Sequence, residues 1–433
     1  MLGSWFRAAP APGCWARRVT VRQWCSSQRV ATRRQYSTIK KDRTAKEPKD
    51  VKPTLGRPGN NLKMGICGLP NTGKSSFFNA LTNSAVPAEN FPFCTINPNE
   101  ARVAVPDERL DWLVDFYKPA STIPAYLSVT DIAGLIKGAA EGLGLGNAFL
   151  SNIQQVDGLF HLCRGFDSSD VLHVEGRIDP ISDLIIIQEE LRLKDADSLN
   201  RLLELKKKES ARAGKNSAKK MEELDVLHKV HEWVVGQKKE VRSGNWSDEE
   251  IEVINSLHLL TAKPAVFLCN ISEKDFIRMS NPWMPVLKGY LGQNHPDDLL
   301  IPFSGELETT LAAMNKIQQN TYLTALSNKY DAPKLAKSAL PDITFAGYDA
   351  LNLQYFFTGG PDEVRAWTIR ANTKAPQAAS VIHSDLEKSF VLAEVMSYDD
   401  LRSYGSEASV KNAGKYVQKG RDYVVQDGDI ICK

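Results

Sequence analysis

The residues with the clearest chemical role form the string Gly68-Leu69-Pro70-Asn71-Thr72-Gly73-Lys74-Ser75, which fits the phosphate-loop pattern G-x-x-x-x-G-K-[ST]. A loop of this kind turns its backbone N–H groups toward a phosphate at a helix N-terminus, where the helix dipole favours negative charge. We expect Lys74 to reach the β- and γ-phosphates, and Ser75 to place its hydroxyl on Mg²⁺. The other nucleotide-binding candidates here are Asn71, Thr72, Gly73 and Ser76. The alternative is a glycine-rich turn that fits the pattern by chance.

Two later segments carry candidates for sensing a γ-phosphate. Thr95 lies in the proline-containing loop 90–99, where it could complete the Mg²⁺ shell as part of a switch segment; the alternative is a structural threonine. The string Asp131-Ile132-Ala133-Gly134 follows a strand-like run and fits D-x-x-G. Its carboxylate can hold a metal-bound water, and the Gly134 N–H can contact the γ-phosphate. Thr95, Asp131 and Gly134 are therefore predicted catalytic residues alongside Lys74.

The residue after Gly134 is Leu135, where many GTPases carry a glutamine that orients the attacking water. Leucine can neither donate nor accept a hydrogen bond, so another group must orient that water. His173, in a loop beyond the strand-like run 158–163, is a candidate; the alternative is a solvated loop histidine. His161, inside that run, is expected in the core. Asn71 is a candidate ligand for K⁺, which could supply the positive charge that an arginine finger otherwise brings.

Base recognition depends on the end of the apolar run 264–269, which is typical of a buried parallel strand. It leads into Asn270-Ile271-Ser272-Glu273, where guanine-specific proteins have N-K-x-D. Because this string lacks the lysine and carries glutamate in place of the aspartate, the guanine clamp is broken and adenine is favoured. We expect Asn270, Ile271, Glu273 and the loop carrying Ser304 to form the base site. A literal N-K-x-D at 328–331 follows a helical pattern and is interpreted as a decoy.

These motifs together resemble the Obg-like ATPase (YchF) family. The resemblance rests on Gly-Leu-Pro-Asn-x-Gly-Lys-Ser, Asn-Phe-Pro-Phe-Cys-Thr-Ile, Asp-Ile-Ala-Gly-Leu-x-Lys-Gly-Ala and Asn-x-Ser-Glu, and extends from about Gly56 to Lys433. It implies a Ras-like NTPase domain interrupted by a coiled coil, then a TGS domain of β-grasp fold. It also implies a preference for ATP over GTP and association with the ribosome.

The patterning of the chain predicts an α/β protein with several domains. Helical spacing predicts an inserted antiparallel coiled coil in 181–261, and short alternating runs predict a small β domain in 344–433. The resemblance implies that the insertion divides a Ras-like P-loop NTPase domain, 61–180 and 262–343, and that the last domain is a β-grasp, TGS-like one. The segment 206–220, at the expected tip of the insertion, holds seven basic residues and one acid. It is either a solvated tip or a contact for ribosomal RNA phosphate. Arg365, Trp367 and Arg370 are candidates for an RNA-facing sheet, with a core position as the alternative for Trp367.

The first 41 residues contain seven arginines and no acidic residue, which is typical of a mitochondrial transit peptide. We place the transit peptide in 1–36 and a linker in 37–60, and predict localisation in the mitochondrial matrix. A basic arm that binds nucleic acid is the alternative. Removing the seven arginines leaves 47 basic against 52 acidic residues, so net charge gives no argument for nucleic-acid binding.

Seven cysteines without a C-x-x-C pair support neither a zinc site nor a disulfide framework. Taken together with the family resemblance, which implies the ribosome association, the sequence predicts a monomeric, Mg²⁺-dependent ATP hydrolase that acts as a switch on the ribosome, without stable membrane insertion. K⁺ is a second candidate cofactor. The alternative is a nucleotide-gated RNA-binding or stress-regulatory adaptor in which hydrolysis is incidental.

Overall fold

The computed structural model of the 433-residue chain describes residues 55–56, 59–84, 99–132, 152–168, 177–212 and 218–432. The predicted transit peptide, Thr95, Gly134, Leu135 and His173 lie outside these residues. Their roles stay predictions.

Among the residues that the structure describes, the first sheet has six strands in the order β2-β4-β1-β5-β6-β7, and only β2 runs antiparallel to its neighbour. β5 and β6 are buried along their whole length, as the continuous apolar runs predicted. The parallel register brings the carboxyl ends of β1, β4, β5 and β6 to one edge, where the phosphate loop begins. The strands are β1 (Lys63–Gly68), β2 (Glu100–Ala104), β4 (Tyr126–Asp131), β5 (Gly158–Arg164), β6 (Ala265–Asn270) and β7 (Leu299–Phe303).

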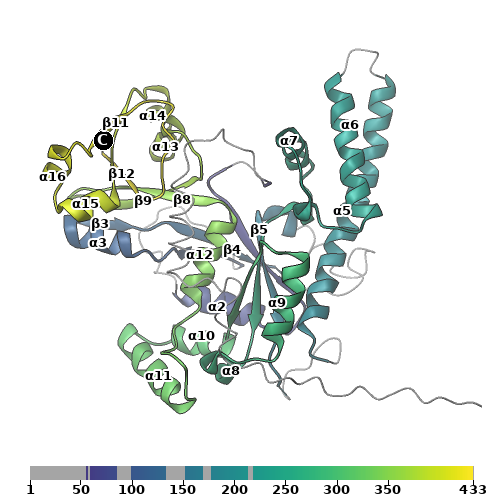
Figure 1. The fold of residues 1–433 in the computed structure, drawn as a ribbon, viewed down its shortest axis with the longest axis horizontal. Coiled ribbons are helices and arrows are strands. Elements are labelled where there is room, and N and C mark those ends of the chain that lie inside the picture. The colour runs from purple at the N-terminus through teal and green to yellow at the C-terminus, as the bar shows by residue number, and fades with distance from the viewer. Residues whose placement is uncertain are drawn as a thin grey trace, which may run out of the picture. The chain divides into compact units, whose positions relative to one another are not determined.

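Helices cover this sheet and fix the position of its loops. In the core, Phe77 of α2 contacts Phe160 of β5 edge-on and Phe303 of β7 at a tilt. The two helices that follow β6 and β7, α8 and α10, share an apolar cluster with α11 (Figure 1). The helices of this part of the chain are α2 (Lys74–Ser84), α3 (Glu108–Tyr117), α8 (Glu273–Arg278), α9 (Trp283–Asn294), α10 (Gly305–Ala312), α11 (Lys316–Lys329) and α12 (Leu340–Ala350).

A helical insertion separates β5 from β6, as predicted. Its long helices α5 (Pro180–Arg212) and α6 (Ala218–His231) lie side by side (Figure 1). They are antiparallel, because Lys206 pairs with Glu223 at 2.5 Å and Asn200 contacts His231 at 2.8 Å. Helix α5 ends at Arg212 and α6 begins at Ala218, so both helices extend into the basic segment 206–220 that was expected at the tip. The insertion continues through the π-helix η3 (Glu232–Gly236), η4 (Val241–Ser243), α7 (Asp248–Leu257) and η5 (Leu260–Ala262).

The second sheet follows the order β11-β10-β12-β8-β9-β3. When strands β8 to β12 are numbered 1 to 5 in chain order, their order in the sheet is 4-3-5-1-2. Helix α13 packs beside β9. This arrangement is the predicted β-grasp fold. Its elements are β8 (Leu353–Thr358), β9 (Glu363–Arg370), α13 (Ala375–Ile382), α14 (Ser384–Lys388), β10 (Ala393–Ser397), α15 (Tyr398–Tyr404), α16 (Glu407–Asn412), β11 (Val417–Lys419) and β12 (Asp429–Cys432).

Two features of the structure cross the predicted domain boundaries. The short strand β3 (Ser121–Ile123) lies within the segment assigned to the NTPase domain, but it pairs in parallel with β9 of the second sheet. The boundary expected after residue 343 falls inside α12, which contacts strands of both sheets. Local sequence patterns predict neither feature. A three-residue strand such as β3, for example, acquires its partner only through tertiary contacts.

The end of the predicted linker 37–60 is packed against the protein. The Gly56 N–H donates to Oδ1 of Asn255 in α7 at 2.8 Å, and the Arg370 N–H donates to Oδ1 of Asn60 at 3.2 Å. Residues from position 55 onward that the structure describes therefore belong to the folded part of the chain.

The three residues proposed for an RNA-facing side of β9 do not all lie on one face of the strand. Arg365 and Trp367 share one side of the strand, where the Arg365 guanidinium lies 3.7 Å from the Trp367 ring centroid. Arg370 is an odd number of positions away from both, so it points to the opposite face. Trp367 also packs against the apolar cluster below α13. Arg365 and Trp367 therefore remain candidates for one face of β9, and Arg370 lies on the other face.

Candidate nucleotide-binding site

The phosphate loop lies between β1 and α2, as predicted. Asn71 and Gly73 have positive φ angles of 63° and 97°. A Cβ atom on Gly73 would lie 2.2 Å from Nδ2 of Asn270, so only glycine fits at this position. The Thr72 side chain is fully buried, and its hydroxyl donates to the Leu69 carbonyl at 2.9 Å. The loop is therefore shaped by its own residues and by one side chain from β6.

Lys74 and Asp131 form a charged centre beside this loop. Lys74 is 8% exposed, and its Nζ donates to the Leu69 carbonyl at 2.8 Å. Asp131 ends β4 and is in register with Ile66 of β1. Burial lowers the pKa of Lys74 and raises the pKa of Asp131, while the charge of each opposes the shift of the other. Each residue therefore stabilises the charged form of its neighbour.

The residues of this edge fit a magnesium ion. Oδ1 of Asp131 is buried and has no hydrogen-bond partner among the described residues, which is costly unless a metal-bound water or a cation contacts it. Ser75 is exposed at the start of α2 and offers a hydroxyl. The described residues contain no group of three or more His, Cys, Asp or Glu that could hold a metal by themselves. That agrees with Mg²⁺, which usually takes one or two protein ligands together with substrate phosphates.

The remaining candidates at the phosphate loop differ in whether their side chains are exposed or buried. Asn71 and Ser76 are exposed, so their side chains are accessible from solvent. Thr72 is buried, so only its backbone can face a phosphate. This division could not be derived from the motif, because the motif fixes residue types and not the direction of each side chain.

Asn270 connects the phosphate loop to the base side of the site. It is 5% exposed; its Nδ2 donates to the Thr72 carbonyl at 3.0 Å, and its Oδ1 accepts from the Gly305 N–H at 2.9 Å. Both polar atoms of its amide are thus used within the protein. The position was predicted from the sequence, but this connecting role was not, since 198 residues separate Asn270 from Thr72.

Ile271 and Ser304 frame the base site through their backbones. Ile271 is 2% exposed, and its N–H donates to the Phe303 carbonyl at 2.9 Å. Ser304 is fully buried and caps α10, with its hydroxyl accepting from the Leu307 N–H. The Ser304 hydroxyl is therefore used as the helix cap of α10, and the role of its loop in the base site stays a prediction.

Glu273 opens α8, whose N-cap is Ser272. Its carboxylate accepts hydrogen bonds from Tyr322 at 3.3 Å and from Tyr330 at 3.4 Å, both from the α11 region. Asn328 and Lys329 of the literal N-K-x-D lie at the end of α11 itself, which confirms that this string is no guanine motif. No motif in the sequence indicated that these two tyrosines would contact the predicted site residue Glu273.

Comparison with known proteins agrees with this geometry. Residues 63–196 match the family described as "50S ribosome-binding GTPase", and residues 353–433 match the YchF-GTPase C-terminal family, described as "Protein of unknown function (DUF933)". The chain is 55% identical over 380 residues to Obg-like ATPase 1 from Rattus norvegicus and from Homo sapiens, which covers 88% of this chain and 93% of each relative. The chain belongs to the Obg-like ATPase (YchF) family.

A solved structure of a family member supports the fold. The Schizosaccharomyces pombe YchF GTPase aligns with a TM-score of 0.80 at 49% identity, covering 88% of this chain and 100% of that one. Obg-like ATPase 1 from Caenorhabditis elegans is 52% identical over 383 residues. The P-loop NTPase domain with its C-terminal YchF domain is thus a shared architecture of the Obg-like ATPase family.

His161 lies in the core, as predicted. His161 is 3% exposed, and burial lowers its pKa to about 3, so it is a neutral core residue. Cys67, Cys163 and Cys269 are buried free thiols.

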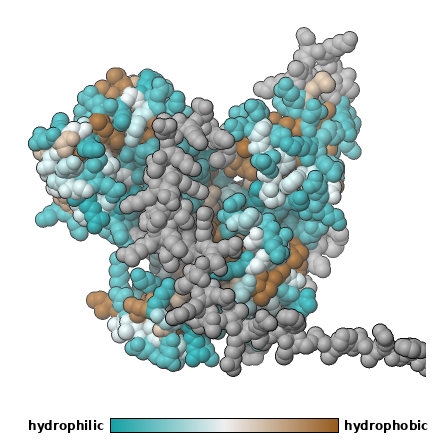
Figure 2. Space-filling model, in the orientation of Figure 1, coloured by the Kyte–Doolittle hydropathy of each residue, from teal (hydrophilic) through white to brown (hydrophobic). Residues whose placement is uncertain are grey.

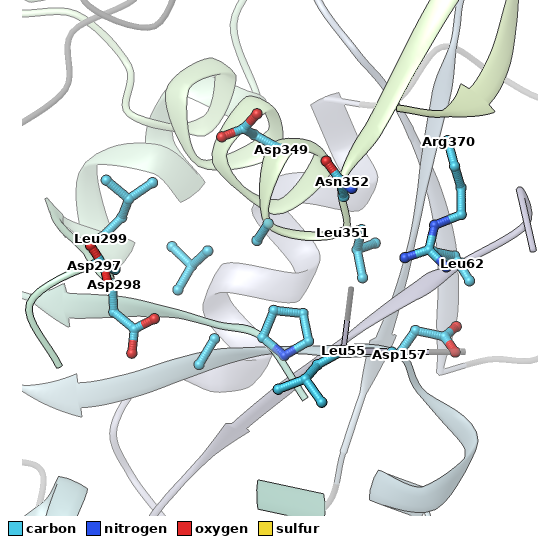
Figure 3. A pocket seen from close by; sticks show the side chains of 15 residues that line it. Leu55, Leu62, Asp157, Asp297, Asp298, Leu299, Asp349, Leu351, Asn352 and Arg370 are labelled. Atoms are coloured by element: carbon cyan, nitrogen blue, oxygen red, sulfur yellow. The ribbon is translucent and has the colours of Figure 1, made fainter. Parts of the chain in front are cut away.

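A cavity of about 310 Å³ lies at the other edge of the first sheet (Figure 3). Figure 3 shows Asp157 and Arg370 on one side of it, and Asp297 and Asp298 on the other. It borders the amino ends of β6 and β7, whereas the phosphate loop follows the carboxyl end of β1. A strand of this length separates the two edges by roughly 20 Å, so the cavity is not part of the nucleotide site.

Exposed apolar side chains are scattered over a largely hydrophilic surface in the view of Figure 2. Among the described residues, the most exposed are Ile317, Val391 and Met221. No helix in the described part of the chain is both long enough and apolar enough to cross a membrane.

Proposed function

We propose that this protein binds and hydrolyses ATP in preference to GTP and acts as a ribosome-associated switch in the mitochondrial matrix. The observation that carries the hydrolytic part is the electrostatic coupling of buried Lys74 to Asp131 beside a phosphate loop, where Oδ1 of Asp131 is buried and has no hydrogen-bond partner among the described residues. The proposal treats the protein as a monomer in which one chain holds all of these groups.

Hydrolysis requires a water to attack the γ-phosphate in line while negative charge is neutralised. Lys74 is placed to stabilise the phosphate oxygens, and Asp131 to hold a metal-bound water. Mg²⁺, when bound, neutralises charge between the β- and γ-phosphates, with Ser75 and Thr95 as its protein ligands. Gly134 is proposed to link the γ-phosphate to the switch, and His173 to orient the water in place of the missing glutamine. Asn71, with its exposed side chain, is proposed to ligate K⁺.

The preference for ATP rests on the residues at the base site. The curated relatives are called ATPases, whereas the Schizosaccharomyces pombe protein is called a GTPase, so names alone do not decide the base. Glu273 stands where guanine-specific sites carry aspartate, and its carboxylate contacts two tyrosines. Asn270 has both amide atoms engaged with the protein. These contacts favour a site that reads adenine through backbone groups around Ile271.

Ribosome association is supported by the family description and by the exposed lysines near the tip of the insertion. Lys207 and Lys208 are exposed at the distal end of α5. Basic side chains on a projecting helix pair can reach RNA phosphates. The same charge also suits a nucleotide-gated RNA-binding or stress-regulatory adaptor, so hydrolysis must be measured in the presence of ribosomes to separate the two functions.

Single-turnover hydrolysis of ATP and GTP, with and without mitochondrial ribosomes, tests the proposal. We expect ATP to be hydrolysed faster than GTP. We also expect ribosomes to raise the rate of ATP hydrolysis at least about tenfold, by completing a catalytic site that is slow without them. Replacing Lys207 and Lys208 with alanine should weaken the stimulation and leave the basal rate unchanged. A rate that ribosomes do not change favours the adaptor, and faster GTP hydrolysis contradicts the proposed base preference.

The matrix localisation is tested with a fusion of residues 1–36 to a fluorescent reporter. We expect import into mitochondria, because the segment is rich in arginine and lacks acids. A matched fusion with its seven arginines changed to glutamine should remain in the cytosol. Cytosolic localisation of the unmodified fusion would overturn the assignment.

A further inference from the structure

The base side of the site contains two tyrosines that no motif predicts. Tyr322 lies in α11 and Tyr330 follows directly after it. The Tyr322 hydroxyl donates to Oε2 of Glu273 at 3.3 Å, and the Tyr330 hydroxyl donates to Oε1 at 3.4 Å. Each carboxylate oxygen therefore has its own phenol donor, and the two donors come from one segment.

The surrounding packing fixes these tyrosines. Both border the apolar cluster that joins α8, α10 and α11. The Tyr330 carbonyl accepts from Nε of Arg278 at 3.2 Å, which links the end of α11 to the end of α8. Burial, with the nearby Glu273 carboxylate, raises the pKa of Tyr322, so its hydroxyl keeps its proton and stays a donor at neutral pH. The donors are therefore held in place independently of any nucleotide.

The direction of the Glu273 carboxylate matters for the choice of base. Guanine offers two neighbouring donors, N1–H and N2–H, and a carboxylate that accepts both must present its two oxygens to the base edge. Adenine offers an acceptor at N1 and a donor at N6, so a carboxylate facing the ring has no such matching pair. A carboxylate with both oxygens directed at phenols is withdrawn from bidentate contact with guanine.

We propose that Tyr322 and Tyr330 are specificity-determining positioning residues, which hold Glu273 toward α11 and so prevent it from serving as a guanine clamp. The inference rests on the proposed preference for ATP and explains it with residues outside the four-residue motif. It differs from a purely structural role, in which the same bonds only fasten α11 to α8 and have no influence on the base.

A double-mutant cycle in the full chain separates these roles. Tyr322→Phe combined with Tyr330→Phe removes both hydroxyls and keeps both rings in the cluster. We expect GTP affinity to rise about five- to tenfold, with ATP affinity changed less than about twofold, because the freed Glu273 can turn toward guanine. In a Glu273→Ala background the same pair of changes should have no effect on either affinity. Competition of ATP and GTP against a fluorescent nucleotide gives both values.

Tyr416→Phe is the matched control, because the Tyr416 hydroxyl donates to Glu394 at 3.0 Å in the C-terminal sheet, away from the base site. It should leave both affinities unchanged. The inference is wrong if the double variant keeps the wild-type ATP-to-GTP ratio, or if the ratio shifts equally without Glu273. Should the double variant unfold, Tyr322→Phe alone is measured, with about half the logarithmic shift expected. A wild type that prefers GTP contradicts the proposed function instead, whatever the variants do.

Discussion

Replacing Lys74 with alanine is expected to reduce the ATP hydrolysis rate by about 10³-fold or more and to weaken binding of the nucleoside triphosphate. Lys74 is the buried cation of the phosphate loop, and its Nζ contacts the loop backbone at the Leu69 carbonyl. In a buried site a positive charge next to the transferred phosphate stabilises the transition state far more than it would in water. Alanine removes this charge from the site.

The fold should survive the Lys74→Ala substitution, because a buried ammonium with a lowered pKa contributes little to stability. Thermal unfolding without nucleotide checks this, and single-turnover kinetics gives the rate. Lys63→Ala is the matched control: Lys63 begins β1, at the end of the strand away from the phosphate loop, and its Nζ pairs with Glu100 at 2.8 Å. Near-normal turnover in Lys74→Ala would show that the loop does not bind a triphosphate as described.

Replacing Asp131 with asparagine is expected to lower hydrolysis by about 10²-fold or more while the protein stays at least as stable. Asparagine keeps the shape of the side chain but removes the charge that holds a metal-bound water. Burial raises the pKa of Asp131, which means that ionising this carboxyl costs more free energy in the folded than in the unfolded protein. Removing that charge therefore removes a cost to folding, even though it leaves Lys74 with one fewer neighbour of opposite charge.

Two results together distinguish a functional carboxylate at Asp131 from a structural one: the activity is lost, and the unfolding temperature is unchanged or raised. Asp111→Asn, the same chemical change on the exposed side of α3, should alter neither property. The effect should also appear as a weaker dependence of the rate on Mg²⁺ concentration. A large drop in stability together with the lost activity would instead place Asp131 among residues that support the fold.

The sequence by itself was sufficient to predict features that depend on residues close together in the chain. The phosphate loop after β1, the carboxylate at the end of β4 and the position of Asn270 at the end of β6 all follow from apolar runs that end in motif residues. Helical spacing predicted the α5 and α6 pair, and short alternating runs predicted a small C-terminal sheet. Thr95, Gly134 and His173 rest on sequence alone, since they lie outside the described residues.

Tertiary structure decided which of these residues act together. It joined Asn270 to the Thr72 carbonyl, used the Ser304 hydroxyl as a helix cap, and placed two tyrosines on Glu273. It also added β3 to the second sheet through pairing with β9. The physical reason is common to all of these contacts. A hydrogen bond between residues far apart in the chain forms only after strand order and helix packing have brought them together, and no local pattern in the sequence records which donor will meet which acceptor.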